Sequence, residues 1–225
     1  MKGFLDRILP VLAIALFLTG VSLGLFFAPA DRMMGDVYRI IYVHVPNAWM
    51  ALLAFTLTFV CSVVYLFKSK MQADALAEAS AEVGILFNGL LLITGSIWGK
   101  PTWGVWWTWD PRLTTAAILF FAFSGYLALR RFVEDPEKRA TWSAVTAILI
   151  YVDVPIVWFS VKWWNTLHQV QSTPKTVDPT MASILRLSAV AFLLLYLWFL
   201  RERYRLARAR QDRDLAPPPV VVSPA

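Results

Sequence analysis

The chain has 225 residues, of which 58% are hydrophobic and only 16% are charged, and its mean hydropathy is +0.58. Soluble domains carry about 25% charged residues, so this composition excludes an ordinary soluble protein. The net charge of +6 does not indicate a nucleic-acid partner, because the basic residues stand mostly at the ends of apolar segments. The single cysteine, Cys61, and the absence of a Cys-x-x-Cys motif argue against dithiol chemistry and covalent attachment of a c-type heme.

Six long apolar segments predict an all-α, multi-spanning membrane protein, because about 20 apolar residues cross a bilayer as a helix. A transmembrane barrel would show alternating segments of ~10 residues instead. In chain order, the predicted spans are Ile8–Phe27, Val45–Phe67, Val83–Ile97, Leu113–Leu129, Thr141–Val161 and Met181–Leu200. The third and fourth are short, and we expect them to extend toward the loop between them, which would lie along the membrane interface.

The first segment has two interpretations. Lys2 and Arg7 precede the apolar run, and Ala28-Pro29-Ala30 follows it, as in a cleaved signal peptide. However, the run of about 20 residues exceeds the roughly 7–15 of a signal peptide, and a proline follows Ala28. We therefore favour an uncleaved first span.

Lysine and arginine predict the orientation of the spans. With the N-terminus inside, about two-thirds of the 21 lysines and arginines fall on the same side as both termini, which places the termini in the cytoplasm. We divide the chain into a six-span domain, residues 1–205, and a basic and then Pro-rich, disordered cytoplasmic tail, residues 206–225. The arginines of the tail are expected to contact anionic lipid.

Tryptophan is concentrated between the third and fourth spans. Only Trp142 and Trp198 fall near the inner face, whereas an aromatic belt would occupy both faces of the membrane. This asymmetry favours an indole surface for a planar apolar ligand. Three of its members are three and four residues apart and would form one stripe on a helix. The five tryptophans of the loop are Trp98, Trp103, Trp106, Trp107 and Trp109.

The residues that open the fourth span have two possible roles each. Asp110 suits the N-cap and Pro111 the first helical position, although Asp110 could instead contact a ligand. Arg112 could pair with a carboxylate of the ligand, although an anchor at the lipid headgroups is the more common role. Inside the spans, Asn88 suits an interhelical hydrogen bond. Asp153 is either a functional residue or part of a kink at Pro155.

Only two histidines occur in the chain, His44 and His168, and both fall at outer ends of spans, on the side of the tryptophan loop. A single histidine is more often structural than a ligand. Two are too few for an ordinary zinc site, which takes three or four protein ligands. Two axial imidazoles suit a six-coordinate heme iron, so we predict a heme held between His44 and His168 against the indoles.

The segment Trp98 to Thr114 resembles the tryptophan-rich "WWD" signature of heme-handling proteins in cytochrome c maturation. It reads Trp-Gly-x-x-x-Trp-Gly-x-Trp-Trp-x-Trp-Asp-Pro-Arg-Leu-Thr. The length, the six spans and the two histidine motifs resemble the C component of that system, the heme exporter protein C family. The resemblance covers nearly the whole chain except the tail.

This resemblance implies that the protein holds heme b, non-covalently and transiently, at the periplasmic face of the bacterial inner membrane. It implies that His44 and His168 are the axial ligands and that Trp98 to Arg112 contacts the porphyrin. The implied partners are a periplasmic heme chaperone (the E component), a small D component and an ATP-binding-cassette pair, A and B. The chain has no GxxxxGK[ST] motif, so any ATP would be used by a partner.

Three other functions are possible from the sequence. A permease subunit that exports heme or another small molecule with an ABC ATPase would need a polar path through the spans, which offer little beyond Asp153 and Asn88. A heme lyase would be an enzyme, and the size and the two histidines argue against one. A scaffold of an ABC complex would not copurify with heme.

Overall fold

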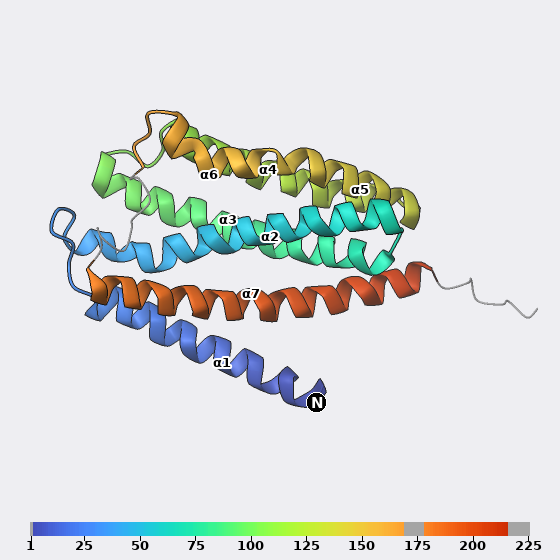
Figure 1. Cartoon of the computed structure of the whole chain (residues 1–225), viewed down its shortest axis with the longest axis horizontal. Helices are drawn as coiled ribbons and strands as arrows, with labels where there is room; N and C mark the ends of the chain where they lie inside the picture. Colours follow the sequence, from blue (N-terminus) through green and yellow to red (C-terminus); the bar gives the residue numbers. More distant parts are fainter. Residues whose placement is uncertain (1, 169–177, 216–225) are drawn as a thin grey trace, which may run out of the picture.

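A computed structural model describes residues 2–168 and 178–215, and its helices lie side by side along one axis (Figure 1). The two termini of the described chain point toward the same end of the bundle (Figure 1). The elements, in chain order, are α1 (Lys2–Ser22), the π-helix η1 (Leu23–Phe27), the 3₁₀-helix η2 (Asp36–Ile40), α2 (Ile41–Lys68), α3 (Met71–Trp103), α4 (Pro111–Phe132), α5 (Pro136–Tyr151), α6 (Asp153–Trp163) and α7 (Pro179–Asp214).

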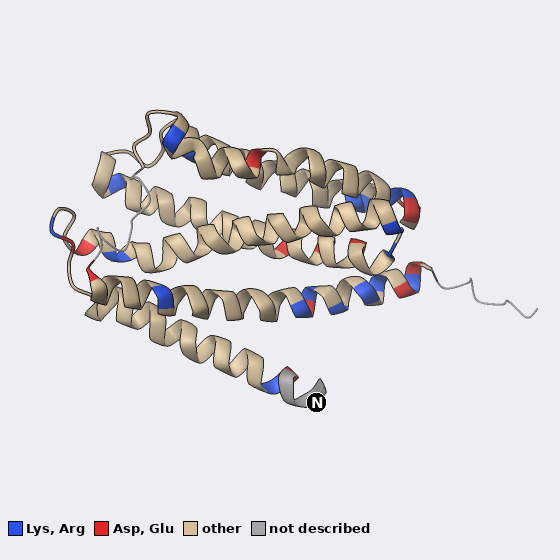
Figure 2. Cartoon of the chain, viewed as in Figure 1, with Lys and Arg blue, Asp and Glu red and all other residues tan. Residues whose placement is uncertain are grey.

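The prediction of an all-α protein with six spans is confirmed. In the described part of the chain, six helical stretches are long and apolar enough to cross a membrane, with η2 and α2 forming one and α5 and α6 another. We call the end that carries residues 104–110 the tryptophan end. The opposite end, where α2 meets α3 and α4 meets α5, is the arginine end. Lys, Arg, Asp and Glu gather at the arginine end of α3, α4 and α7 (Figure 2).

Helix α3 is longer than the predicted third span. Its 33 residues rise about 50 Å, whereas the hydrocarbon core of a bilayer is about 30 Å thick. Its first turns carry Asp74 and Glu78, which hydropathy alone assigns to a loop. Arg130 of α4 donates to Asp74 at 2.6 and 2.9 Å and to Glu78 at 3.0 Å, and all three side chains are buried. Because these charges are paired, the acidic first turns of α3 can be buried in the bundle.

The same charged cluster includes the last turns of α7. The boundary after residue 205 falls inside α7, which continues to Asp214. Gln211 is buried and donates to Asp74 at 2.8 Å, and Arg210 pairs with Glu78 at 2.9 Å. Residues 206–214 thus belong to the bundle, because their polar side chains pair with α3. The predicted disordered residues 216–225 lie outside the described part of the chain.

The fifth span is interrupted at Val152, between α5 and α6. Pro155 has no backbone N–H and its ring crowds the carbonyl four residues earlier, which breaks an α-helix at this point. The predicted fifth span is thus divided into α5 and α6 next to this proline. The Oδ2 atom of Asp153 is buried and has no hydrogen-bond partner among residues 2–168 and 178–215.

The main core lies between α2, α3, α4 and α7. Phe55 of α2 stacks on Phe123 of α4, with ring centroids 4.0 Å apart. Gly84 lets α3 approach closely, since a Cβ there would lie 2.7 Å from Phe55 Cε1. Asn88 is buried and donates to the carbonyl of Ala116 at 3.1 Å, which confirms its predicted role between helices. This packing holds the ends of α2, α3 and α4 in register at the tryptophan end.

Candidate functional site

The tryptophan loop begins where α3 ends. Gly104 adopts φ 81°, and its N–H donates to the carbonyl of Lys100 at 3.0 Å, a left-handed C-cap that stops the helix after Trp103. Trp98 and Trp103 are therefore helical, whereas Trp106 lies in irregular chain. Trp103, Trp106 and Trp107 therefore do not form the stripe that they would form on a helix, because the left-handed glycine ends the helix after Trp103.

The loop tryptophans expose much of their surface. The exposed fractions are 57% for Trp106, 37% for Trp107 and 81% for Trp109. Ser96 Oγ donates to the carbonyl of Trp106 at 2.7 Å, and Lys100 Nζ donates to that of Gly104 at 3.0 Å, so the loop is tied back to α3. Exposed indoles on a fixed backbone are suited to contact an apolar ligand or a partner.

His44 lies in the first turn of α2 and is buried against α3. Its ring meets that of Trp98 edge to face, with centroids 5.5 Å apart. Its Nδ1 atom is 3.0 Å from Thr94 Oγ1. Gly95 leaves room for the imidazole, since a Cβ at this position would lie 3.0 Å from His44 Cε1.

The hydrogen bond between His44 and Thr94 identifies the tautomer of the imidazole. The Thr94 hydroxyl donates its single proton to the carbonyl of Leu90 at 2.7 Å. A hydroxyl that donates to Leu90 accepts from His44, and this arrangement favours the tautomer of the neutral ring with its proton on Nδ1. In this tautomer the Nε2 atom of His44 keeps its lone pair and can bind a metal. Histidines that ligate a metal usually donate their other ring N–H to a neighbouring group in this way.

His168 follows α6 and lies against the end of α3. Its ring centroid is 5.3 Å from that of Trp103, and 22% of its side chain is exposed. Burial, together with the nearby charge of Arg112, lowers the pKa of His168 to about 4. The imidazole is therefore neutral at pH 7. Its Nδ1 atom lies 3.7 Å from Asp110 Oδ1, beyond hydrogen-bond distance, and has no partner in the described chain.

Asp110 is both the cap of α4 and the anchor of the segment that carries His168. Its Oδ1 accepts from the N–H of Arg112 at 2.9 Å. Its Oδ2 accepts from the Thr166 hydroxyl at 2.6 Å and from the N–H of Leu167 at 2.7 Å. Burial acts to raise the pKa of the Asp110 carboxyl, but these hydrogen bonds outweigh it and hold the pKa below its usual value. The predicted cap is confirmed.

Four predicted site residues come together at the tryptophan end. Asp110 Oδ1 accepts from the backbone N–H of Arg112 and lies 3.7 Å from the Nδ1 atom of His168. His44 contacts Trp98 and His168 contacts Trp103, which are separated by about 7.5 Å along the axis of α3. Helices α2, α3 and α4 and the chain after α6 thus contribute to one site.

The chemistry of this site fits a heme better than a bare metal ion. It offers two neutral imidazoles, indoles for an apolar ring, and one arginine for carboxylates. Within residues 2–168 and 178–215, no three His, Cys, Asp or Glu side chains gather as ligands of one metal ion. Trp98, whose ring contacts His44, has a buried Nε1 without a hydrogen-bond partner in these ranges.

Residues that sequence reasoning missed build much of this site. Thr94, Gly95 and Thr166 each contact a predicted ligand or its anchor, yet each is a common small residue in an unremarkable sequence context. Spacing gives a partial signal for Thr94, because it lies one helical turn before Trp98. Thr166 lies in irregular chain, where no periodicity applies.

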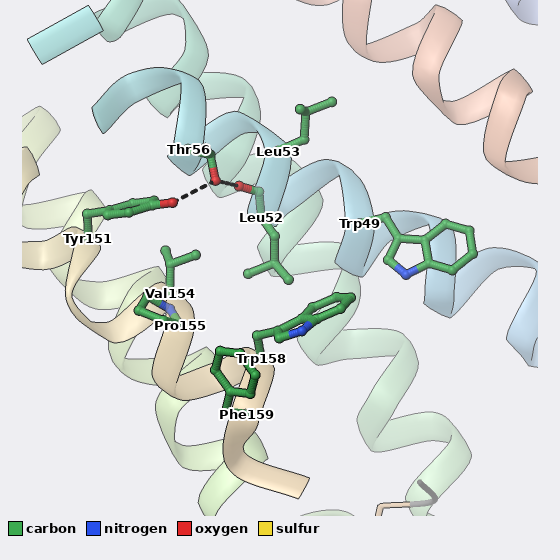
Figure 3. A pocket seen from close by; sticks show the side chains of 9 residues that line it. All are labelled: Trp49, Leu52, Leu53, Thr56, Tyr151, Val154, Pro155, Trp158 and Phe159. Carbon is green, nitrogen blue, oxygen red and sulfur yellow. Dashed lines mark hydrogen bonds between the residues drawn. The ribbon is translucent and has the colours of Figure 1, made fainter. Parts of the chain in front are cut away.

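A groove of about 460 Å³ opens between α2 and the α5–α6 pair (Figure 3). It is almost entirely apolar; its polar groups include the hydroxyls of Thr56 and Tyr151, which lie 3.3 Å apart (Figure 3). Neither histidine lines it. The groove therefore lacks the charged or polar lining of a hydrophilic path through the spans. Its lining residues are Trp49, Leu52, Leu53, Thr56, Tyr151, Val154, Pro155, Trp158 and Phe159.

Comparison with known proteins matches residues 1–216 to the model of a family described as heme exporter protein C. Heme exporter protein C of Haemophilus influenzae is 40% identical over 214 residues, which cover 93% of this chain and 87% of the relative. That of Escherichia coli K12 is 38% identical over 188 residues, covering 83% and 77%. A mitochondrial protein of Marchantia polymorpha, named for cytochrome c biosynthesis, is 41% identical over 158 residues, covering 69% and 67%.

Proposed function

The chain belongs to the heme exporter protein C family, which handles heme for cytochrome c biogenesis, and from this premise we propose that it is a heme-holding and heme-delivery protein. In this proposal heme b is cargo, bound non-covalently and transiently. His44 and His168 ligate the iron from opposite faces through Nε2. The observation that carries the proposal is that both imidazoles lie against tryptophans of the last turns of α3, His44 against Trp98 and His168 against Trp103.

Each group has a distinct role in this proposal. The indoles of Trp98, Trp103, Trp106, Trp107 and Trp109 shield the macrocycle from water, and Arg112 pairs with a propionate. Two strong axial ligands leave the iron no open position, so it is carried rather than used for oxygen chemistry. The protein then needs no catalytic residue of its own and acts as a binding and transfer protein rather than an enzyme.

We place the protein in the bacterial inner membrane, with both termini cytoplasmic and the tryptophan end at the periplasmic face. The concentration of lysine and arginine at the opposite end supports this orientation (Figure 2). The proposed acceptor of the heme is a periplasmic heme chaperone, the E component. A small D component and the ATP-binding-cassette components A and B are the proposed membrane partners, and they supply any ATP hydrolysis.

The test is the absorption spectrum of the protein purified from heme-replete cells, for the wild type and for His44→Ala and His168→Ala. We expect bis-imidazole bands in the wild type and their loss in each variant, with most of the heme lost. Trp142→Phe, at the arginine end, is the matched control and keeps the bands. Unchanged bands in both histidine variants would refute axial ligation, and a wild type without heme would favour a scaffold.

A further inference from the structure

The two proposed ligands are held in different ways. His44 belongs to a helix, and its ring is held by Thr94, Gly95 and Trp98 of α3. His168 lies in irregular chain five residues beyond the end of α6, where Trp164 is extended at φ −129° and ψ 156°. A histidine on irregular chain has no helix to fix its position, so other parts of the protein must hold the segment that carries it.

Three hydrogen bonds provide those contacts. The Thr166 hydroxyl donates to Asp110 Oδ2 at 2.6 Å, and the N–H of Leu167 donates to the same oxygen at 2.7 Å. The Thr166 oxygen also accepts from the N–H of His168 at 3.1 Å. Thr166 therefore connects the buried carboxylate of Asp110 directly to the backbone of the proposed ligand.

We propose that Asp110 and Thr166 form a hydrogen-bonded clasp that positions His168, and that Asp110 acts on the heme only through this histidine. This inference rests on the proposed function. In this inference, the aspartate of the tryptophan-rich motif contacts other protein groups rather than the heme, because the oxygens of Asp110 already accept three hydrogen bonds. Thr166 and Asp110 are positioning residues that lie one step behind the iron ligand.

The chemistry of the clasp requires a carboxylate. Oδ1 is used by the α4 cap and Oδ2 by the two donors of the segment after α6, so both oxygens must accept. In Asp110→Asn one of the two oxygens is replaced by an NH₂ group. This group is a donor and faces another donor, so no hydrogen bond forms there. That variant loses either the cap or the clasp, so it does not separate them. Thr166→Val removes the hydroxyl alone and leaves the α4 cap intact.

The experiment compares Thr166→Val with Thr166→Ser, which keeps the hydroxyl, and with Thr115→Val. The Thr115 hydroxyl donates to the carbonyl of Pro111 within α4 at 2.8 Å and touches neither histidine segment. Each full-length protein is loaded with hemin, and its heme affinity, its spin state by absorption, and its melting temperature without heme are measured.

We expect heme affinity to fall about tenfold in Thr166→Val, at the lower end of the usual range for partners behind a metal ligand. Its spectrum shifts toward the five-coordinate form seen in His168→Ala, and added imidazole restores the six-coordinate bands in both. Thr166→Ser and Thr115→Val behave as the wild type. A melting temperature unchanged from that of Thr115→Val shows that folding is not the cause.

Two results overturn the clasp. One is a Thr166→Val protein whose spectrum and affinity match the wild type while His168→Ala has lost its bands. The other is a loss of heme that Thr166→Ser does not rescue. If His168→Ala itself keeps bis-imidazole bands, then the proposed function fails instead, so the two failures are distinguishable.

Discussion

Replacing Thr94 by valine removes the acceptor that holds the Nδ1 proton of His44. Valine has nearly the same shape, so the packing against α3 stays, while the 3.0 Å hydrogen bond to His44 and the bond that the hydroxyl donates to the Leu90 carbonyl are lost. An unpaired N–H on a buried imidazole costs about 1–3 kcal/mol. The ring can relieve this cost by moving its proton to Nε2, which is the atom that the iron needs. Either way, we expect heme affinity to fall roughly 10- to 100-fold.

The assay is a hemin titration of the purified protein followed by absorption. Thr94→Ser keeps the hydroxyl and is expected to bind as the wild type. Thr102→Val is the matched control, because the Thr102 hydroxyl donates to the carbonyl of Trp98 in its own helix at 2.8 Å. A Thr94→Val protein that binds heme within about twofold of the wild type, while His44→Ala has lost it, would refute the reasoning about the tautomer.

Two further predictions concern folding and are read from thermal unfolding in detergent. Arg130→Ala leaves Asp74 buried without the guanidinium that donates to it at 2.6 and 2.9 Å. We therefore expect the free energy of unfolding to fall by about 3–5 kcal/mol. A smaller loss than that caused by replacing an exposed arginine with alanine would contradict this prediction. Gly84→Ala places a Cβ 2.7 Å from the Phe55 ring and should destabilise the protein by about 1–3 kcal/mol. The Cβ of Gly125→Ala meets nothing within 4 Å, so this variant should stabilise the protein by about 0.4–1 kcal/mol. Equal effects of the two variants would contradict the close packing of Gly84 against Phe55.

The long helix α3 connects the two polar ends of the molecule. Its first turns carry Asp74 and Glu78, which pair with Arg130, and its last turns carry Trp98 and Trp103, which contact the two histidines. A break in the pairing at the arginine end would therefore loosen the helix that supports the site.

Sequence reasoning identified the spans because hydropathy over about 20 residues measures the cost of crossing a bilayer, which depends on composition alone. It was less accurate about where helices end. The acidic start of α3 and the arginines of α7 are polar in sequence, and only their pairing across helices makes them part of the bundle. Gly104 is a clear helix terminator in the structure, but the sequence does not reveal which glycine adopts a left-handed conformation.

By itself, the sequence determined that this protein crosses a membrane with helices and carries two histidines and a tryptophan-rich loop, since these depend on residue types and local spacing. Only the tertiary structure decided that Asp110 anchors Thr166, and that Thr94 holds the proton of His44. These pairs are separated by about 50 residues or more in the chain. Hydrogen bonds act over about 3 Å, so only the packing of α2, α3 and α4 brings such partners within reach.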